Sequence, residues 1–207
     1  MQRMAGAHYF SPDPDTPLIR RQVEVELAGR RVEVTTSGGI FSPDGIDKGT
    51  AVLLQRAPTP PQQGALLDLG CGWGPIALTM AQLAPQAAVW AVDVNERART
   101  LCRENAEALG LDNVTVAAPD EVGEEVRFAG IWSNPPIRIG KAALHDLLLT
   151  WLPRLTPGGE AWLVVQKNLG ADSLQRWLSE HLSAEYDVDR PASQKGFRLL
   201  RVERSSP

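Results

Sequence analysis

The chain has 207 residues, a hydrophobic content of 43% and a charged content of 22%, which are values typical of one globular domain. No apolar run approaches the roughly 20 residues that a membrane-spanning helix needs, so we expect no membrane partner. A net charge of −4 argues against a protein that binds nucleic acid mainly through general attraction to phosphate. The two cysteines and three histidines show no metal-ligand spacing, so we expect no metal site, no disulfide scaffold and a cytoplasmic location.

The first part of the chain predicts a loop followed by a β-hairpin. Residues 11–17 are rich in proline and aspartate and are typical of a loop. Apolar and polar residues then alternate on both sides of a short turn, which predicts an antiparallel hairpin over residues 21–36. We therefore expect residues 1–48 to form an N-terminal hairpin extension and residues 49–207 to form the main domain.

From residue 51 onward, predicted helices and strands alternate along the chain. The helices are predicted over residues 51–57, 75–83, 96–109, 141–155 and 173–182. The strands are predicted over residues 65–69, 88–92, 114–117, 129–133 and 161–166, with two late antiparallel strands over 186–188 and 197–202. This alternation indicates an α/β fold, in which a mainly parallel sheet is covered on both faces and a ligand sits beyond the carboxyl ends of the strands.

Three alternating glycines, Gly70, Gly72 and Gly74, follow the first predicted strand of this sheet. Without Cβ atoms the backbone can turn tightly and lie against a ligand, and the next helix offers free N–H groups. Nicotinamide and flavin enzymes use similar loops, so the glycines alone leave the cofactor open. Asp68 ends the strand, and a buried carboxylate there needs a partner such as the amino group of a methionine-type ligand. A negatively charged pyrophosphate would be a less favourable partner for this carboxylate.

Two further carboxylates follow the next two predicted strands. Asp93 lies about 20 residues beyond the glycine loop, where it can accept hydrogen bonds from ribose hydroxyls or cap the following helix. Asp120 can accept a hydrogen bond from an adenine amine or cap a helical turn. Together with the glycine loop, these residues resemble the S-adenosylmethionine site of class I methyltransferases, over residues 48–204. The resemblance implies a Rossmann-like sheet of seven strands, mainly parallel, whose last strand is antiparallel.

The same resemblance implies S-adenosylmethionine as the cofactor and S-adenosylhomocysteine as its product. The implied cofactor-binding residues are Asp68, Gly70, Cys71, Gly72, Trp73, Gly74, Asp93, Val94, Asp120 and Asn134. Asp68 and the glycines are expected to hold the methionine part, Asp93 the ribose and Asp120 the adenine. Trp73 is expected to cover the ligand from within the loop.

The predicted catalytic residues are Asn134, Pro135, Pro136 and Ile137, directly after the fourth strand. The lone pair of an exocyclic amine is delocalised into its ring. Catalysis therefore requires acceptors that fix the direction of the amine's N–H bonds, so that the lone pair turns toward the methyl group, rather than a strong base. The side-chain carbonyl of Asn134 and the backbone carbonyl of Pro135 offer two acceptors, and the prolines stiffen the turn. The motif resembles that of amino-nitrogen methyltransferases acting on adenine, guanine or glutamine, which usually carry Tyr or Phe in place of Ile137.

Other segments are similar to the small-subunit ribosomal RNA guanine-N2 methyltransferases, especially their single-domain form. These segments are residues 8–10, 39–42, 47–49, 134–138, 140–141, 166–167 and 195–197. The resemblance implies ribosomal RNA or the small ribosomal subunit as the partner. The expected substrate-binding residues are Phe41, Lys48, Arg138, Lys141 and Lys167. Asp47 is a further candidate to line the pocket, and Phe41 or Trp73 is expected to stack on the base in place of Ile137.

Three other interpretations stay open. An amino-nitrogen methyltransferase acting on protein glutamine or DNA adenine shares the motif, and Ile137 counts against it. A nicotinamide-dependent oxidoreductase shares the glycine loop, whereas Asp68 and Asn134 count against that class. A cofactor-binding module without activity is the third alternative.

Overall fold

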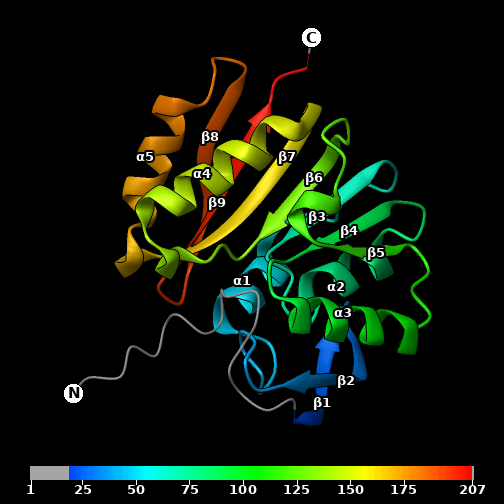
Figure 1. Cartoon of the computed structure of the whole chain (residues 1–207). Coiled ribbons are helices and arrows are strands. Elements are labelled where there is room, and N and C mark those ends of the chain that lie inside the picture. Colours follow the sequence, from blue (N-terminus) through cyan, green and yellow to red (C-terminus); the bar gives the residue numbers. More distant parts are fainter. Residues whose placement is uncertain (1–18, 207) are drawn as a thin grey trace.

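The computed structural model describes residues 19–206 and shows a seven-stranded sheet with helices on both faces (Figure 1). In sheet order the strands are β5 (Val114–Ala117), β4 (Ala88–Val92), β3 (Ala65–Leu69), β6 (Phe128–Ser133), β7 (Leu155–Gln166), β9 (Phe197–Arg204) and β8 (Tyr186–Gln194). Strands β3 to β7 pair in parallel, and β9 is antiparallel to both of its neighbours. The expected Rossmann-like sheet is therefore confirmed. The predicted loop over 11–17 and the segment 8–10 lie outside the described residues.

Five helices cover this sheet: α1 (Lys48–Arg56), α2 (Pro75–Leu83), α3 (Glu96–Ala108), α4 (Lys141–Trp151) and α5 (Ala171–His181). Helices α1 and α2 bury residues such as Val52 and Met80 in one apolar cluster. Helices α4 and α5 bury residues such as Leu148 and Leu178 in a second cluster. Within the described part of the chain, no helix combines the length and apolarity that crossing a membrane requires.

The N-terminal strands β1 (Arg20–Leu27) and β2 (Arg30–Ser37) form the predicted antiparallel hairpin. Its two turn residues, Ala28 and Gly29, have φ angles of 50° and 76°, as a tight two-residue turn requires. The hairpin lies against α2 and α3, away from the main sheet (Figure 1). The side chain of Asn105 on α3 bonds both backbone groups of Thr35, which attaches β2 to the helix. The domain boundary at residue 48 stays a prediction.

Two predicted helices, α1 and α4, differ from the structure by three or more residues at one end. Helix α1 begins at Lys48, three residues before the predicted start, because the Asp47 side chain caps it by accepting from the backbone N–H groups of Gly49 and Thr50. Helix α4 ends at Trp151, before the predicted end at residue 155. A short 3-10 turn containing Pro153 follows, since proline cannot continue an α-helix.

Two predicted strands, β7 and β8, are each six residues longer than expected. Strand β7 begins at Leu155, six residues before the predicted start, and includes residues 157–159. The register with β6 shifts there, and Gly159 leaves no room for a Cβ atom beside the Thr156 carbonyl. Strand β8 extends to residue 194, and its Pro191 is tolerated because β8 lies at the edge of the sheet.

The order of the strands changes direction beside β3. The chain first adds β4 and β5 on one side of β3, and then adds β6 and β7 on the other. Such a change opens a crevice beyond the carboxyl ends of the two strands that flank it. The fold therefore places the ends of β3 and β6, with the segments that follow them, on the two sides of one crevice.

Candidate active site

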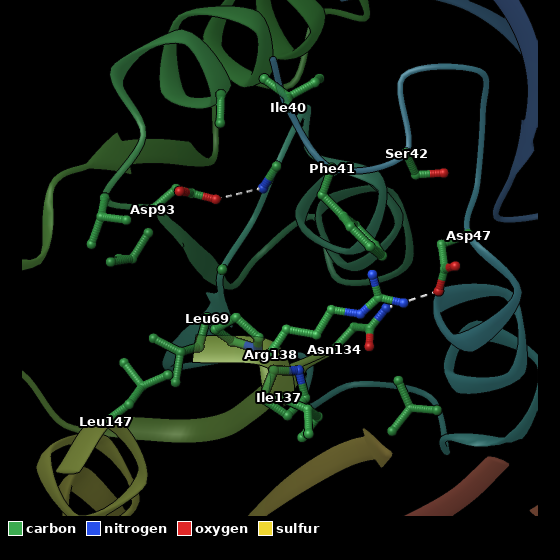
Figure 2. Close-up of a pocket in the computed structure, with 18 of the residues that line it drawn as sticks. Ile40, Phe41, Ser42, Asp47, Leu69, Asp93, Asn134, Ile137, Arg138 and Leu147 are labelled. Atoms are coloured by element: carbon green, nitrogen blue, oxygen red, sulfur yellow. Dashed lines mark hydrogen bonds between the residues drawn. The ribbon is translucent and has the colours of Figure 1, made fainter. Parts of the chain in front are cut away.

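A cavity of about 380 Å³ lies at this crevice. Its walls include Gly70 and Gly72 after β3, Asp93 after β4, Asn134 after β6 and Gln166 at the end of β7. Figure 2 shows Asp93 and Asn134 on different walls of the same space. The volume falls within the range of ~300–1,000 Å³ that small-molecule sites occupy. The structure thus brings together four segments that are far apart in the sequence.

The three glycines after β3 have separate roles. All have positive φ angles, of 81° for Gly70, 55° for Gly72 and 104° for Gly74, which L side chains rarely adopt. A Cβ atom on Gly70 or Gly72 would meet nothing within 4 Å, so these two residues leave open space beside the cavity. A Cβ atom on Gly74 would lie 2.8 Å from the Cys102 sulfur. Gly74 is therefore required for the packing of α2 against α3.

Asp93 lies on the cavity wall and also braces the glycine loop. Its Oδ2 accepts from the backbone N–H of Gly72 at 2.9 Å, and its Oδ1 accepts from that of Asn95 at 2.9 Å. Burial raises the pKa of the Asp93 carboxyl above its ordinary value, although these hydrogen bonds oppose the rise. Each carboxylate oxygen keeps a further lone pair that can accept from a ligand hydroxyl.

Asp68 does not line the cavity and lies behind the glycine loop, so its expected role in holding the methionine part of the cofactor stays a prediction. Its side chain is fully buried, and its Oδ2 accepts from the backbone N–H of Ala77 in α2 at 2.9 Å. Its Oδ1 has no hydrogen-bond partner among the described residues. Burial raises the pKa of Asp68 to about 8. The carboxyl therefore fixes the start of α2 relative to β3.

Cys71 and Trp73 do not line the main cavity, and both line a small pocket that shares Gly70, Gly72 and Asn134 with it. Trp73 is 1% exposed, packs among hairpin and helix residues, and donates from its ring nitrogen to the Ser42 carbonyl at 3.2 Å. This burial contradicts the predictions that Trp73 covers the ligand or stacks on a base. Cys71 is a buried loop residue, and a hydrogen bond with Cys102 together with burial raises the pKa of its thiol well above the ordinary value.

The Asn-Pro-Pro segment forms a stiff turn directly after β6. Pro136 has φ −74° and ψ 73°, and the backbone N–H of Ile137 donates to the Pro135 carbonyl at 2.8 Å. This geometry is that of an inverse γ-turn. The Pro135 carbonyl was expected to accept from the substrate, and one of its two lone pairs is therefore already used within the turn. Asn134, Pro135, Pro136 and Ile137 all line the cavity.

The side chain of Asn134 has a fixed orientation. Its Nδ2 donates to Oδ2 of Asp47 at 3.0 Å and to Oγ1 of Thr50 at 3.1 Å. Figure 2 shows the bond to Asp47 across the space between β6 and α1. Thr50 was not anticipated from the sequence, and the signal that could have found it is the capping position of Asp47. Both hydrogens of the nitrogen are engaged, so the amide oxygen is left for the cavity.

Apolar side chains form much of the cavity rim. Phe41, Val94 and Leu169 all line it, and they are 43%, 44% and 42% exposed. Phe197 and Ile137 line it as well. Exposed apolar groups that border one cavity indicate a binding site. Phe41 stays the predicted residue for stacking on a base.

The remaining predicted residues lie on or beside the rim. Arg138 lines the cavity and is exposed, and Lys48, Lys141 and Lys167 are exposed residues near its walls. Asp120 is exposed and follows Pro119, which lines the cavity, so its proposed contact with adenine stays a prediction. Among residues 19–206, no three His, Cys, Asp or Glu side chains form a group that could hold a metal ion.

Comparison with known proteins identifies the family of this chain. The methyltransferase small domain matches residues 31–201. The chain belongs to this family. The uncharacterized protein YbxB of Bacillus subtilis is 33% identical over 200 residues, which cover 95% of this chain and 98% of that protein. The ribosomal RNA small subunit methyltransferase C of Pseudomonas aeruginosa is 31% identical over 93% of this chain, which spans only 57% of that relative's length.

Solved structures agree with this assignment. The 16S rRNA N2 methyltransferase RsmC of Thermus thermophilus, in complex with AdoMet and guanosine, has a TM-score of 0.73 at 24% identity. The match covers 92% of this chain and 52% of that one, and at this identity it shows a shared fold. Membership of the class I S-adenosylmethionine-dependent methyltransferases and the predicted cofactor are confirmed. The oxidoreductase alternative is therefore wrong.

We expect the variant Asp93→Ala to weaken the binding of S-adenosylhomocysteine by roughly 10- to 100-fold, because it removes a charged acceptor from the cavity wall and releases the Gly72 backbone. Isothermal titration calorimetry measures this change. Asp112→Ala is the matched control, since Asp112 is an exposed aspartate before β5, at the opposite edge of the sheet. Equal affinities of the two variants would contradict the role of Asp93.

The raised pKa of Asp68 predicts a pH dependence of stability. Its pKa of about 8 in the folded state lies above the ordinary value of ~3.9, so between these values the folded protein keeps a proton that the unfolded chain releases. The free energy of unfolding therefore decreases as pH rises through this window. In Asp68→Asn it should decrease less between pH 5 and 8, by at least ~1 kcal/mol, as measured by urea unfolding. Asp93 titrates in both proteins, and parallel pH profiles would contradict the prediction.

Proposed function

We propose that this protein transfers a methyl group from S-adenosylmethionine to the exocyclic N2 amine of a guanine in small-subunit ribosomal RNA, in the cytoplasm. The observation that carries the proposal is the Asn134 amide, whose nitrogen is engaged by Asp47 and Thr50 while its oxygen is left for the cavity. An acceptor at this position suits a nucleophile that carries N–H bonds. The relative from Pseudomonas aeruginosa and the solved structure with guanosine support ribosomal RNA and guanine.

The cofactor fits the wall opposite Asn134. Gly70 and Gly72 leave space where side chains would otherwise project, Asp93 offers acceptors for hydroxyls, and Val94 exposes an apolar surface for a purine. Asp68, Cys71 and Gly74 stabilise this loop from behind without touching the main cavity. The cofactor itself supplies an activated methyl group on a sulfonium.

The chain's own residues orient the target amine. The Asn134 oxygen and the second lone pair of the Pro135 carbonyl accept its two N–H bonds, which turns the nitrogen lone pair toward the remaining direction. The base has to leave its helix to reach this site, and the apolar surfaces of Phe41, Ile137 and Phe197 can contact its ring. No general base is required, because the amine loses its proton after the methyl group has been transferred.

Unpaired cations beside the cavity suit a polyanionic substrate. Lys48 follows Asp47, and Arg138 and Lys141 follow the catalytic turn. The backbone N–H of Lys167 donates to the Gly196 carbonyl at 2.8 Å, which brings the turn at Lys195 to the same rim. None of these five side chains forms an ion pair with a carboxylate of the described residues. We assign this rim to contacts with RNA phosphates.

The proposal predicts a labelled product. With labelled S-adenosylmethionine and unmodified small ribosomal subunits or naked small-subunit RNA, nucleoside mass spectrometry should detect N2-methylguanosine. Asn134→Ala should lower the rate of transfer by about 100-fold or more, since an oriented acceptor is lost. Its affinity for S-adenosylhomocysteine should fall by less than about 10-fold, since Asn134 is only one of the residues expected to bind the cofactor.

Each alternative gives its own product. Methylated adenine in DNA or methylated glutamine in a protein substrate, without N2-methylguanosine, would replace guanine as the target. Bound cofactor with no transfer to any of these substrates would indicate a binding module. A wild-type rate in Asn134→Ala would contradict the role given to Asn134.

The cationic rim predicts salt-dependent binding of RNA. Lys167→Glu should weaken RNA binding and lower the slope of log affinity against log salt by about one, as expected for one lost phosphate contact. Arg127→Glu is the matched control, because Arg127 precedes β6 at the opposite edge of the sheet. Filter binding over a series of salt concentrations measures both variants, and identical slopes would contradict the assignment.

A further inference from the structure

Two residues at the start of α1 hold the nitrogen of the Asn134 side chain. Asp47 and Thr50 stand 87 and 84 positions before Asn134 in the sequence, and each accepts one hydrogen bond from its Nδ2. A primary amide nitrogen has two hydrogens, so both are used. We call Asp47, Thr50 and Asn134 the amide clamp.

The hydrogen bonds of the amide clamp allow only one orientation of the Asn134 amide. A carboxylate accepts hydrogen bonds and donates none, so only the NH₂ end of the amide can face Asp47. Rotation of the amide by half a turn would place the Asn134 oxygen against Oδ2 of Asp47, where two acceptors would repel each other. It would also turn the NH₂ group of Asn134 toward the N–H bonds of a target amine, so that donors would face donors. The clamp therefore excludes the orientation that cannot bind the amine.

The clamp is itself fixed by the fold. The same Oδ2 of Asp47 accepts from the backbone N–H groups of Gly49 at 2.7 Å and Thr50 at 3.3 Å, as the N-cap of α1. Helix α1 in turn packs against β7 and β9. A Cβ atom on Gly49 would lie 2.9 Å from Oδ2 of Asp47, 3.0 Å from Phe197 and 3.3 Å from Nδ2 of Asn134. Only glycine leaves room for this close packing.

We propose that Asp47 and Thr50 are positioning residues for methyl transfer, which hold the Asn134 amide with its oxygen toward the target amine. The inference rests on the proposed function and adds to it the origin of the orientation of Asn134. Because the bonds join the N-cap of α1 to the turn after β6, the start of α1 becomes part of the catalytic machinery without contacting the reacting atoms.

Two variants of Asp47 and one of Thr50 separate positioning from helix capping. Asp47→Asn keeps a side-chain oxygen that can accept from Asn134 and from the helix, so its kcat should stay within a few-fold of wild type. Asp47→Ser caps the helix well but is too short to reach Asn134. We expect it to retain wild-type stability and affinity for S-adenosylhomocysteine, and to lower kcat by roughly 10- to 100-fold. Thr50→Val, which removes one acceptor at constant volume, should lower kcat by a smaller factor.

A double-mutant cycle tests whether Asp47 acts through Asn134. Adding Asp47→Ser to Asn134→Ala should cause little further loss of kcat, since the amide to be positioned is already absent. Equal losses in the two backgrounds, or a wild-type kcat in Asp47→Ser, would overturn the proposal.

A second measurement does not depend on the substrate. In nuclear magnetic resonance spectra of wild type, the two side-chain N–H signals of Asn134 should exchange slowly with solvent, and in Asp47→Ser they should exchange much faster. Unchanged exchange would overturn the clamp even if no methyl acceptor were found. Absence of N2-methylguanosine together with the expected change in exchange would instead reject the proposed substrate and keep the clamp.

Discussion

The change of strand order between β3 and β6 decides which residues can meet in this molecule. Parallel strands end at a common edge, so the glycine loop after β3, Asp93 after β4 and Asn134 after β6 reach one crevice although long helices separate them in sequence. Elements outside the sheet then close that crevice. The segment between the hairpin and α1 contributes Phe41 to its rim, and the cap of α1 contributes Asp47. The strand order thus sets the position of the cavity, and side chains from elements outside the sheet complete its walls.

Three carboxylates near this crevice make the same kind of hydrogen bond but hold different segments in place. Asp68, Asp93 and Asp47 each accept a hydrogen bond from a backbone N–H at or near the start of a helix or the glycine loop. These bonds fix the relative positions of α2, the loop and α1. Burial raises the pKa of Asp68 and of Asp93. Of these two carboxyls, Asp93 lines the cavity and Asp68 does not, so a ligand in the cavity can contact Asp93.

Much of the fold could be predicted from the sequence, because hydrophobic periodicity and turn residues are local signals. The strand ends at Asp93 and Asn134 followed from such signals, and the parallel sheet then placed both at one edge. The orientation of a side chain at a strand end is not local, since it depends on pairing with neighbouring strands, and Asp68 accordingly lies behind the loop. The burial of Trp73 depends on a hairpin that packs over it from elsewhere in the chain. The bond between Asp47 and Asn134 joins residues 87 positions apart, and no local pattern encodes it.

Ile137 stands where amino-nitrogen methyltransferases usually carry Tyr or Phe, and distant segments of the chain supply aromatic rings to the cavity instead. Its backbone N–H closes the γ-turn on the Pro135 carbonyl, so the residue contributes to the geometry of the turn through a group that every residue except proline has. Its side chain supplies an apolar surface without a ring. The aromatic rings that line the cavity come instead from Phe41, before α1, and Phe197, at the start of β9. Contact with the proposed base therefore depends on segments outside the Asn-Pro-Pro motif, one of which also carries the helix cap that we propose to position Asn134.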